Sequence, residues 1–270
     1  MAVPVGLAIA FIGIFVGMIL KGGTFAAIIS IPAALMVFAG TFGACVASFS
    51  LKEVIGSIKA MFSVAFKERP ERRPELISTL VGFSEKARRE GLLVLEDDAK
   101  NVDDEFLRKG VQLVVDGTDP ELVRDILETE VEGMEHRHRQ VQEIYKNAGA
   151  FAPTIGILGT VLSLVSVLQH LDQPNHLGPA ISAAFLATFY GVFSANIVYI
   201  PIQNALKKRS GQEVEERTLM IEGILSIQSG DNPRVLDQKL KSFLPPELRE
   251  AEGEEAGGGG GGRAAEREAA

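Results

Sequence analysis

The chain has 270 residues, of which 46% are hydrophobic, and a formal net charge of −8. These averages fit a soluble protein of one or two domains, but the charged residues are unevenly distributed. Lys, Arg, Asp and Glu are absent from residues 1–20, 22–51, 147–171 and 173–206. These windows exclude a wholly soluble chain, and the single cysteine, Cys45, excludes a disulfide framework and a thiolate metal site.

Each uncharged window is long enough to cross a bilayer. A transmembrane helix needs about 20 apolar residues, which span roughly 30 Å at about 1.5 Å per residue. The sequence therefore predicts transmembrane helices at residues 1–20, 24–50, 148–171 and 178–206. The first is unlike a secretory signal, because it lacks a basic N-terminal region and a second apolar run follows at once.

The basic residues predict the orientation of these helices. Apart from Lys21, every Lys and Arg lies between Lys52 and Lys146 or from Lys207 onward. Flanking basic residues mark the cytoplasmic side of a membrane. We therefore expect residues 51–147 and 207–250 to be cytoplasmic, together with both termini, in a multi-pass membrane protein.

The cytoplasmic segments are predicted to be helical. Leu51 begins an amphipathic pattern suited to a membrane surface, a second helix covers about residues 74–89, and Gly91 separates it from a short third helix. Asp119 and Pro120 are typical of a helix start, and nothing breaks the following pattern before the third span. Further amphipathic helices are expected within residues 207–250, and a disordered tail at 251–270.

The predicted fold class is therefore all-α: a polytopic membrane protein with four transmembrane helices and a helical cytoplasmic domain. Its sequence has no nucleophile elbow or phosphate-binding glycine loop. His136 and His138 are two residues apart, which places them on different faces of a helix, where one metal ion cannot bind both. We expect no enzymatic activity, no catalytic residues, no bound metal or cofactor, and no nucleic-acid partner.

Small and hydroxyl-bearing residues share one face of each of the last two spans. They are Pro153, Gly156, Thr160 and Ser163 in the third span, and Thr188, Gly191 and Ala195 in the fourth. Such a face allows either close helix packing or a hydrated path for ions. A proton path needs a group that titrates, whereas the spans contain no carboxylate and threonine hydroxyls do not ionise near neutral pH. The acid must then be supplied by another chain.

Three motifs accompany the order of two spans, a charged segment, two more spans and a charged tail. They are "ARREGLLVLEDD", "APTIGILGTVLSLVSVL" and "AISAAFLATFYGVFSANIVYIPIQNALKKRS". Together they resemble the MotA/PomA family of flagellar motor stator subunits, which act in motility. The resemblance implies an ion-driven complex with a MotB-type partner, in which transmembrane ion flow becomes rotation and torque on the rotor.

The resemblance also implies partners and site residues. Copies of the chain would form a ring, expected to be a pentamer, around single-span MotB-type subunits that carry an intramembrane Asp. Arg88 and Glu96 would face the rotor switch-complex protein, with Arg89 as the alternative basic residue. The ion pathway and its gating would involve Pro153, Thr160, Thr188 and Pro201. The coupling ion is the proton by default and sodium as the alternative, because a hydroxyl at Thr160 is similar to sodium-driven members.

Two other functions stay open at this stage. The related TolQ/ExbB energisers of envelope transport share the hydroxyl pattern but normally have one span before the cytoplasmic segment. The other alternative is a stand-alone channel or carrier, which the lack of an intramembrane acid or base disfavours. The two apolar windows before Lys52 favour the flagellar stator.

Overall fold

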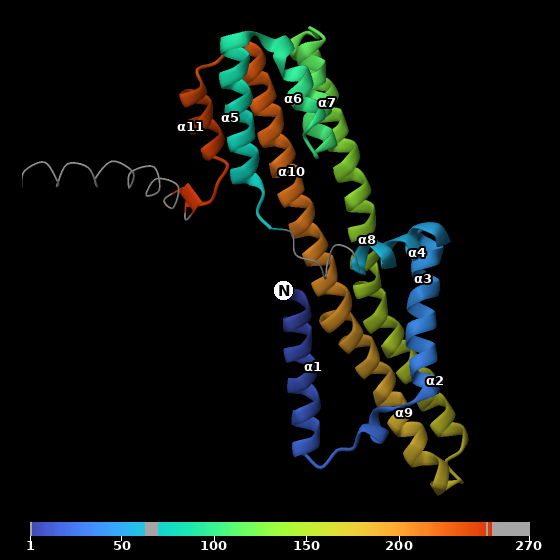
Figure 1. Ribbon diagram of the computed structural model, residues 1–270. Coiled ribbons are helices and arrows are strands. Elements are labelled where there is room, and N and C mark those ends of the chain that lie inside the picture. The colour runs from blue at the N-terminus through green and yellow to red at the C-terminus, as the bar shows by residue number, and fades with distance from the viewer. Residues whose placement is uncertain (1, 63–69, 247, 250–270) are drawn as a thin grey trace, which may run out of the picture. The chain divides into compact units, whose positions relative to one another are not determined.

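A computed structural model describes all residues except 1, 63–69, 247 and 250–270 (Figure 1). The tail expected at residues 251–270 therefore lies outside the described residues, as does the stretch 63–69 of the expected cytoplasmic segment. Throughout the described ranges the elements are helical and no β-strand occurs, so the all-α class is confirmed. The chain forms two compact units, one from residues 1–69 and 135–211 and one from residues 70–134 and 212–270.

The first unit holds the apolar helices and the amphipathic helix α4 (Leu51–Ala60). The apolar helices are α1 (Ala2–Leu20), η1 (Phe25–Ile28), α2 (Ile31–Ala34), η2 (Leu35–Ala39), α3 (Gly40–Ser48), α9 (Pro174–Phe193) and η5 (Ser194–Tyr199). Two longer helices, α8 (Pro120–Gln169) and α10 (Ile200–Ser229), contribute residues to both units. The structure thus has one helix from Pro120 through most of the third apolar window, with Pro153 inside it.

Among the described residues, three helical stretches are long and apolar enough to cross a membrane. They are Ile31–Ser48 and parts of Pro120–Gln169 and Leu177–Ser229. The first apolar helix, Pro4–Leu20, is shorter than these three stretches. The helix in the second window starts only at Ile31, because Pro32 sets a helical first turn while residues 25–28 form a separate 3-10 turn.

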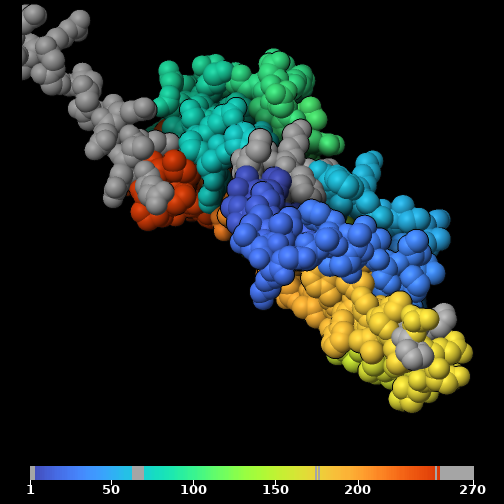
Figure 2. All heavy atoms as spheres, turned by 90° about the horizontal axis from the view of Figure 1, so that it is seen from below, coloured from blue at the N-terminus to red at the C-terminus, as the bar shows by residue number. Residues whose placement is uncertain are grey.

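Aromatic side chains join the N-terminal helix to the fourth apolar helix. The Phe11 ring lies 5.0 Å from the Phe193 ring in an edge-to-face arrangement, and Phe15 also contacts Phe193. Figure 2 shows the blue N-terminal residues lying against the orange-yellow residues of α9 and η5 on this face. Ring packing thus contributes to holding α1 against the end of α9.

Helix α4 begins with a capping box. The Ser50 hydroxyl accepts a hydrogen bond from the Glu53 backbone N–H at 3.3 Å, and the Glu53 carboxylate accepts from the Ser50 N–H at 2.8 Å. The buried Tyr145 hydroxyl of α8 donates to the Ser57 carbonyl oxygen at 3.0 Å. This bond fixes α4 against α8 within the first unit.

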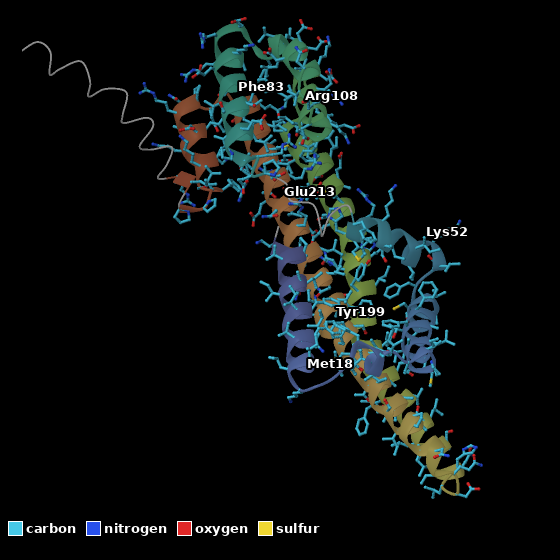
Figure 3. All side chains as sticks on the ribbon, turned by 60° about the horizontal axis from the view of Figure 1, so that its bottom comes forward. Met18, Lys52, Phe83, Arg108, Tyr199 and Glu213 are labelled. Atoms are coloured by element: carbon cyan, nitrogen blue, oxygen red, sulfur yellow. The ribbon has the colours of Figure 1, made fainter. Side chains whose placement is uncertain are left out.

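The second unit is a helical cluster with its own apolar core. Besides parts of α8 and α10 it contains α5 (Arg73–Glu90), η4 (Leu92–Val94), α6 (Leu95–Lys100), α7 (Glu105–Val115) and α11 (Pro233–Lys241). Its fully buried side chains include Leu80, Leu95, Leu107, Leu127, Leu219, Ile224 and Leu236. Phe83 lies inside this cluster and Arg108 on its surface (Figure 3). The Asp119 carboxylate accepts from the Glu121 N–H at 2.9 Å, which confirms the expected helix start.

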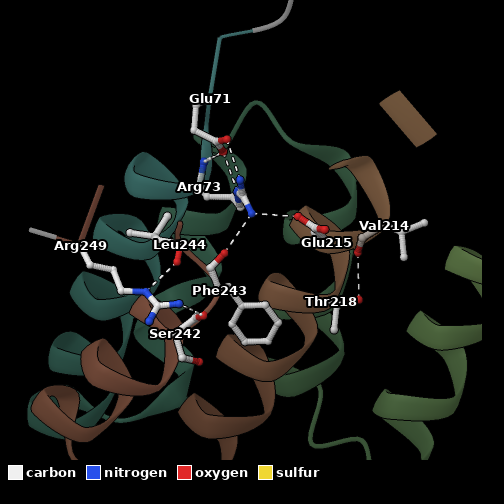
Figure 4. A network of polar contacts seen from close by, with 9 residues as sticks. All are labelled: Glu71, Arg73, Val214, Glu215, Thr218, Ser242, Phe243, Leu244 and Arg249. Carbon is white, nitrogen blue, oxygen red and sulfur yellow. Dashed lines mark hydrogen bonds and ion pairs between the residues drawn. The ribbon is translucent and has the colours of Figure 1, made fainter. Parts of the chain in front are cut away.

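A buried arginine closes the second unit. The Arg73 side chain, only 11% exposed, donates twice to the Glu71 carboxylate at 2.7 and 2.8 Å. Its remaining nitrogen donates to the Glu215 carboxylate and to the Phe243 carbonyl oxygen, both at 2.9 Å (Figure 4). Arg73 therefore ties α5 to α10 and to the chain that follows α11.

We expect Arg73→Met to loosen α11. The substitution leaves the Phe243 carbonyl without its donor, at a cost of about 1–3 kcal/mol, so amide exchange in α11 should accelerate about tenfold or more. Hydrogen exchange on the full chain measures this acceleration. The matched control is Arg89→Met, which removes only the exposed ion pair with Glu85. The hydrogen bond with Arg73 lowers the pKa of Glu71. The stabilisation that this bond gives the folded state is therefore present at neutral pH and is lost as the pH falls from 4.5 through the lowered pKa. Equal exchange in both variants would contradict this role for Arg73.

Candidate ion pathway and charged hairpin

The structure brings Thr160 and Thr188 together. Their hydroxyl oxygens lie 2.5 Å apart across α8 and α9. Thr160 Oγ1 also lies 2.8 Å from the Ala184 carbonyl oxygen and 3.1 Å from the Gly156 carbonyl oxygen. A hydroxyl has one proton, so Thr160 donates to a carbonyl while it accepts from Thr188. Four oxygens thus meet at one point between two apolar helices, and both threonines are half-buried.

Glycines allow this close approach of α8 and α9. A Cβ added at Gly156 would lie 2.8 Å from the Ala187 carbonyl oxygen, and one added at Gly191 would overlap the Ala152 carbonyl oxygen. The backbones therefore meet directly, as small residues permit in membranes. The small residues on this face therefore allow close helix packing, and the same contact brings the oxygens together.

Pro153 lies within α8 and interrupts its hydrogen bonding. Proline has no N–H, so the carbonyl of Gly149, four residues earlier, loses its helical donor. Gly149 faces the start of α10 closely, since a Cβ added there would lie 3.1 Å from Ile200 Cγ1. Ile200 immediately precedes Pro201, so the residue whose carbonyl Pro153 frees packs against the residue before Pro201.

Pro201 follows a π-helical stretch, η5 (Ser194–Tyr199), that the sequence pattern does not predict. Side chains satisfy some of the displaced carbonyls, because Asn196 donates to the Val192 carbonyl at 2.9 Å and Ser194 to the Gly191 carbonyl at 3.2 Å. Single π turns are frequent at functional sites in helices. Tyr199, at the end of the stretch, packs among the helices of this unit (Figure 3).

Tyr190 is a further residue that sequence reasoning missed. Its hydroxyl accepts a hydrogen bond from the Ser30 N–H at 3.0 Å and donates to the Ile28 carbonyl oxygen. It thereby fixes the link before α2 against α9, two residues from Thr188. The only signal in the sequence is a phenol within an apolar span, which needs a polar partner.

The second unit contains the charged hairpin, which consists of the end of α5, Gly91, η4 and α6. Arg88 and Arg89 lie in the last turn of α5, Gly91 takes a positive φ of 88°, and Glu96 lies in the first turn of α6. Arg88, Arg89 and Glu96 are all exposed. Lys86 binds both carboxylate oxygens of Asp98 at 2.8 Å, which joins the two arms of the hairpin.

The exposed charges differ in their pairing. Arg89 pairs with Glu85 at 3.2 Å, whereas within the described part of the chain Arg88 has no ion pair. Lys100 contacts Asp97 at 3.1 Å and Glu96 at 3.2 Å, and these hydrogen bonds raise the pKa of the Lys100 ammonium. Arg88 and Glu96 are not bonded to each other. Arg88 is therefore available to another molecule, whereas Glu96 would exchange its exposed pair with Lys100.

No group of three or more His, Cys, Asp or Glu residues is placed to hold a metal ion within the described ranges. His136 contacts Gln140, and His138 contacts Ser210 at 3.2 Å. The two histidines thus have different neighbours, as their spacing indicates.

Comparison with known proteins finds matches over most of the chain. Residues 4–91 match the family "Motility protein A N-terminal", and residues 98–218 match the "MotA/TolQ/ExbB proton channel family". Motility protein A of Bacillus subtilis is 45% identical over 242 residues, which is 89% of each chain. The chain belongs to the Motility protein A family. Within it, the Chemotaxis protein PomA of Vibrio alginolyticus is 33% identical over 90% of this chain and 95% of the relative.

A solved structure agrees with the fold. The flagellar MotAB stator complex from Bacillus subtilis contains a chain that matches with a TM-score of 0.85 and 43% identity. The match covers 93% of this chain and 99% of that one. The family resemblance inferred from the sequence motifs is therefore confirmed.

We expect Gly191→Ala to separate α8 from α9, since the new methyl group would collide with backbone rather than with a flexible side chain. Overpacking of this kind costs about 1–3 kcal/mol. Thermal unfolding of the detergent-solubilised complex should show a lower midpoint. Gly211→Ala, where a Cβ meets nothing within 4 Å, is the control. Equal midpoints for the two variants would mean that the backbone contact is unimportant.

Proposed function

We propose that the chain is a stator subunit of the bacterial flagellar motor, which with a MotB-type partner converts transmembrane ion flow into rotation and torque on the rotor. The observation that carries this proposal is the likeness, over nearly the whole chain, to a MotAB stator complex. The family match to residues 4–91 favours this function over an envelope energiser, because it covers both early apolar helices.

The proposed chain crosses the inner membrane four times, with both termini in the cytoplasm. The first span is α1, whose 19 residues fall within the range of about 17–25 that a membrane helix needs. The concentration of Lys and Arg in residues 52–146 and from Lys207 onward supports this orientation. Several large side chains on α1, α3, α8 and α9 are exposed in the isolated chain, as lipid or neighbouring subunits require.

The ion pathway uses an acid from the partner. The apolar spans carry no carboxylate, while the oxygens around Thr160 and Thr188 are polar but cannot titrate near neutral pH. In the proposed complex, five copies of the chain surround MotB-type single-span subunits, and an intramembrane Asp of the partner lies beside this oxygen cluster. Protonation and release of that Asp drive the ring.

Pro153 and Pro201 are the proposed gating residues. Each removes a helical hydrogen bond, and Gly149, whose carbonyl Pro153 frees, packs against Ile200, the residue before Pro201. The π-helical stretch before Pro201 has a displaced hydrogen-bond pattern, so a small change of pitch there needs few bonds to break. The helices around the pathway can therefore respond locally to a change of charge on the partner's Asp.

Arg88 and Glu96 form the proposed rotor contact. Both side chains are exposed, and Arg88 has no competing ion pair among the described residues. Arg89 is paired with Glu85 at 3.2 Å, so unlike Arg88 it would have to exchange that exposed pair for a rotor group, as Glu96 would exchange its pair with Lys100. Charges of opposite sign at the two ends of the hairpin can set the register of a partner that carries the complementary pattern.

The test reverses these charges. We expect Arg88→Glu or Glu96→Lys to leave the protein in the membrane and bound to its single-span partner while swimming is impaired. An opposite charge change on the rotor should partly restore swimming, because complementarity guides encounter and register. Co-purification of the partner is the control for assembly. Ordinary swimming of the double reversal with an unaltered rotor would refute the contact.

The proposed coupling ion is the proton, with sodium as the alternative. Thr160 uses its proton in a hydrogen bond, and its remaining oxygen capacity suits a water chain as well as a cation. We expect motor speed at fixed pH to be independent of external sodium. A saturating rise with sodium that Thr160→Ala abolishes would instead identify sodium, since a hard cation needs several oxygen ligands together.

A further inference from the structure

One apolar side chain is exposed at the tip of the charged hairpin. In the run Leu92–Leu95, Leu95 is fully buried and Leu92 and Val94 pack against the core of the second unit, but Leu93 is 73% exposed. Gly91 fixes this arrangement, because its φ of 88° turns the chain sharply between α5 and η4. The 3-10 turn then directs its neighbours inward and leaves Leu93 in solvent.

Charged residues flank Leu93 on both sides. Those at the end of α5 and the start of α6 are Arg88, Arg89, Glu90, Glu96, Asp97 and Asp98. Because Glu96, Asp97 and Asp98 are acidic, an apolar membrane surface or an anionic lipid is an unsuitable neighbour for this tip. A protein surface with a small apolar pocket and charges of opposite sign at the matching positions fits it better.

Exposed charges alone make a weak contact. Surface ion pairs are screened and contribute little to affinity, although they steer association and set register. Interfaces take most of their binding energy from a few residues that fill desolvated pockets inside a polar rim. The hairpin has such a rim, and Leu93 is the apolar group within it.

We propose that Leu93 is the apolar anchor of the rotor contact. It inserts into an apolar pocket of the rotor switch-complex protein, with an acidic group of that protein opposite Arg88 and a basic group opposite Glu96. This inference rests on the proposed stator function. It assigns the binding affinity for the rotor protein to Leu93, and the register of the two proteins to Arg88 and Glu96.

The experiment measures binding of the purified rotor switch-complex protein to the full stator complex in detergent, at ionic strengths of about 0.1 M and 1 M, where the Debye length is about 10 Å and 3 Å. The variants are Leu93→Gln, Leu93→Met and Arg88→Gln. The matched control is Val235→Gln, because Val235 is 57% exposed on α11 of the same unit. Ring size and co-purification of the single-span partner are recorded for each.

We expect Leu93→Gln to weaken binding about tenfold at both salt concentrations, with the ring intact. Leu93→Met should stay within about threefold of the original, because volume and apolarity are kept. Arg88→Gln should weaken binding at low salt and much less at high salt. Val235→Gln should have no effect.

Three results would overturn the anchor. They are unchanged binding by Leu93→Gln, a defect of Leu93→Gln that disappears at high salt, and dissociation of the ring, which would make a second copy of this chain the occupant. If Arg88→Gln is defective while Leu93→Gln is normal, only the anchor fails. Absence of rotor binding by the unaltered complex would refute both the anchor and the proposed rotor contact.

Discussion

The direct contact between the backbones of α8 and α9 determines the rest of the candidate pathway. Gly156 and Gly191 have no room for a Cβ, so the helices approach until carbonyl oxygens and hydroxyls of opposite helices meet. In an apolar environment each of these polar groups needs a partner, and Thr160 and Thr188 supply one to each other. Close packing and a polar path are therefore not competing explanations here, because the packing places the oxygens.

The apolar spans hold polar groups without holding charge. A buried ionised carboxylate is costly in a membrane, and a subunit without one folds and inserts at no such cost. In the proposed stator the titrating group belongs to the partner, so charge reaches the oxygen cluster only after assembly. Hydroxyls and displaced carbonyls near Pro153 and Pro201 can respond to that charge, whereas a fixed ion pair in the same place would neutralise it permanently.

Charge distribution and helix punctuation made most of the architecture predictable. The apolar windows, the end of α5 at Gly91 and the start of α8 at Pro120 all depend on local residue chemistry. The π turn of η5 was not predictable, because the 3.6-residue pattern continues through it. The Thr160–Thr188 and Tyr190–Ser30 bonds join residues 28 and 160 positions apart, so one helix pattern cannot reveal them. The burial of Arg73 was not predictable either, because its partners Glu215 and Phe243 lie 142 and 170 positions away in the sequence.

The charges of the second unit fall into two classes that suit two tasks. Arg73 is nearly buried and makes four hydrogen bonds with fixed geometry to Glu71, Glu215 and Phe243, so its contacts persist. The pairs of Arg89 and Lys100 at the hairpin are exposed and screened, and each exchanges readily for water or for another charge. A surface that engages a moving rotor must release each contact after it has acted. Weak exposed pairs on a rigid, well-packed base meet that requirement, and strong buried pairs at the same position would hold the rotor in place.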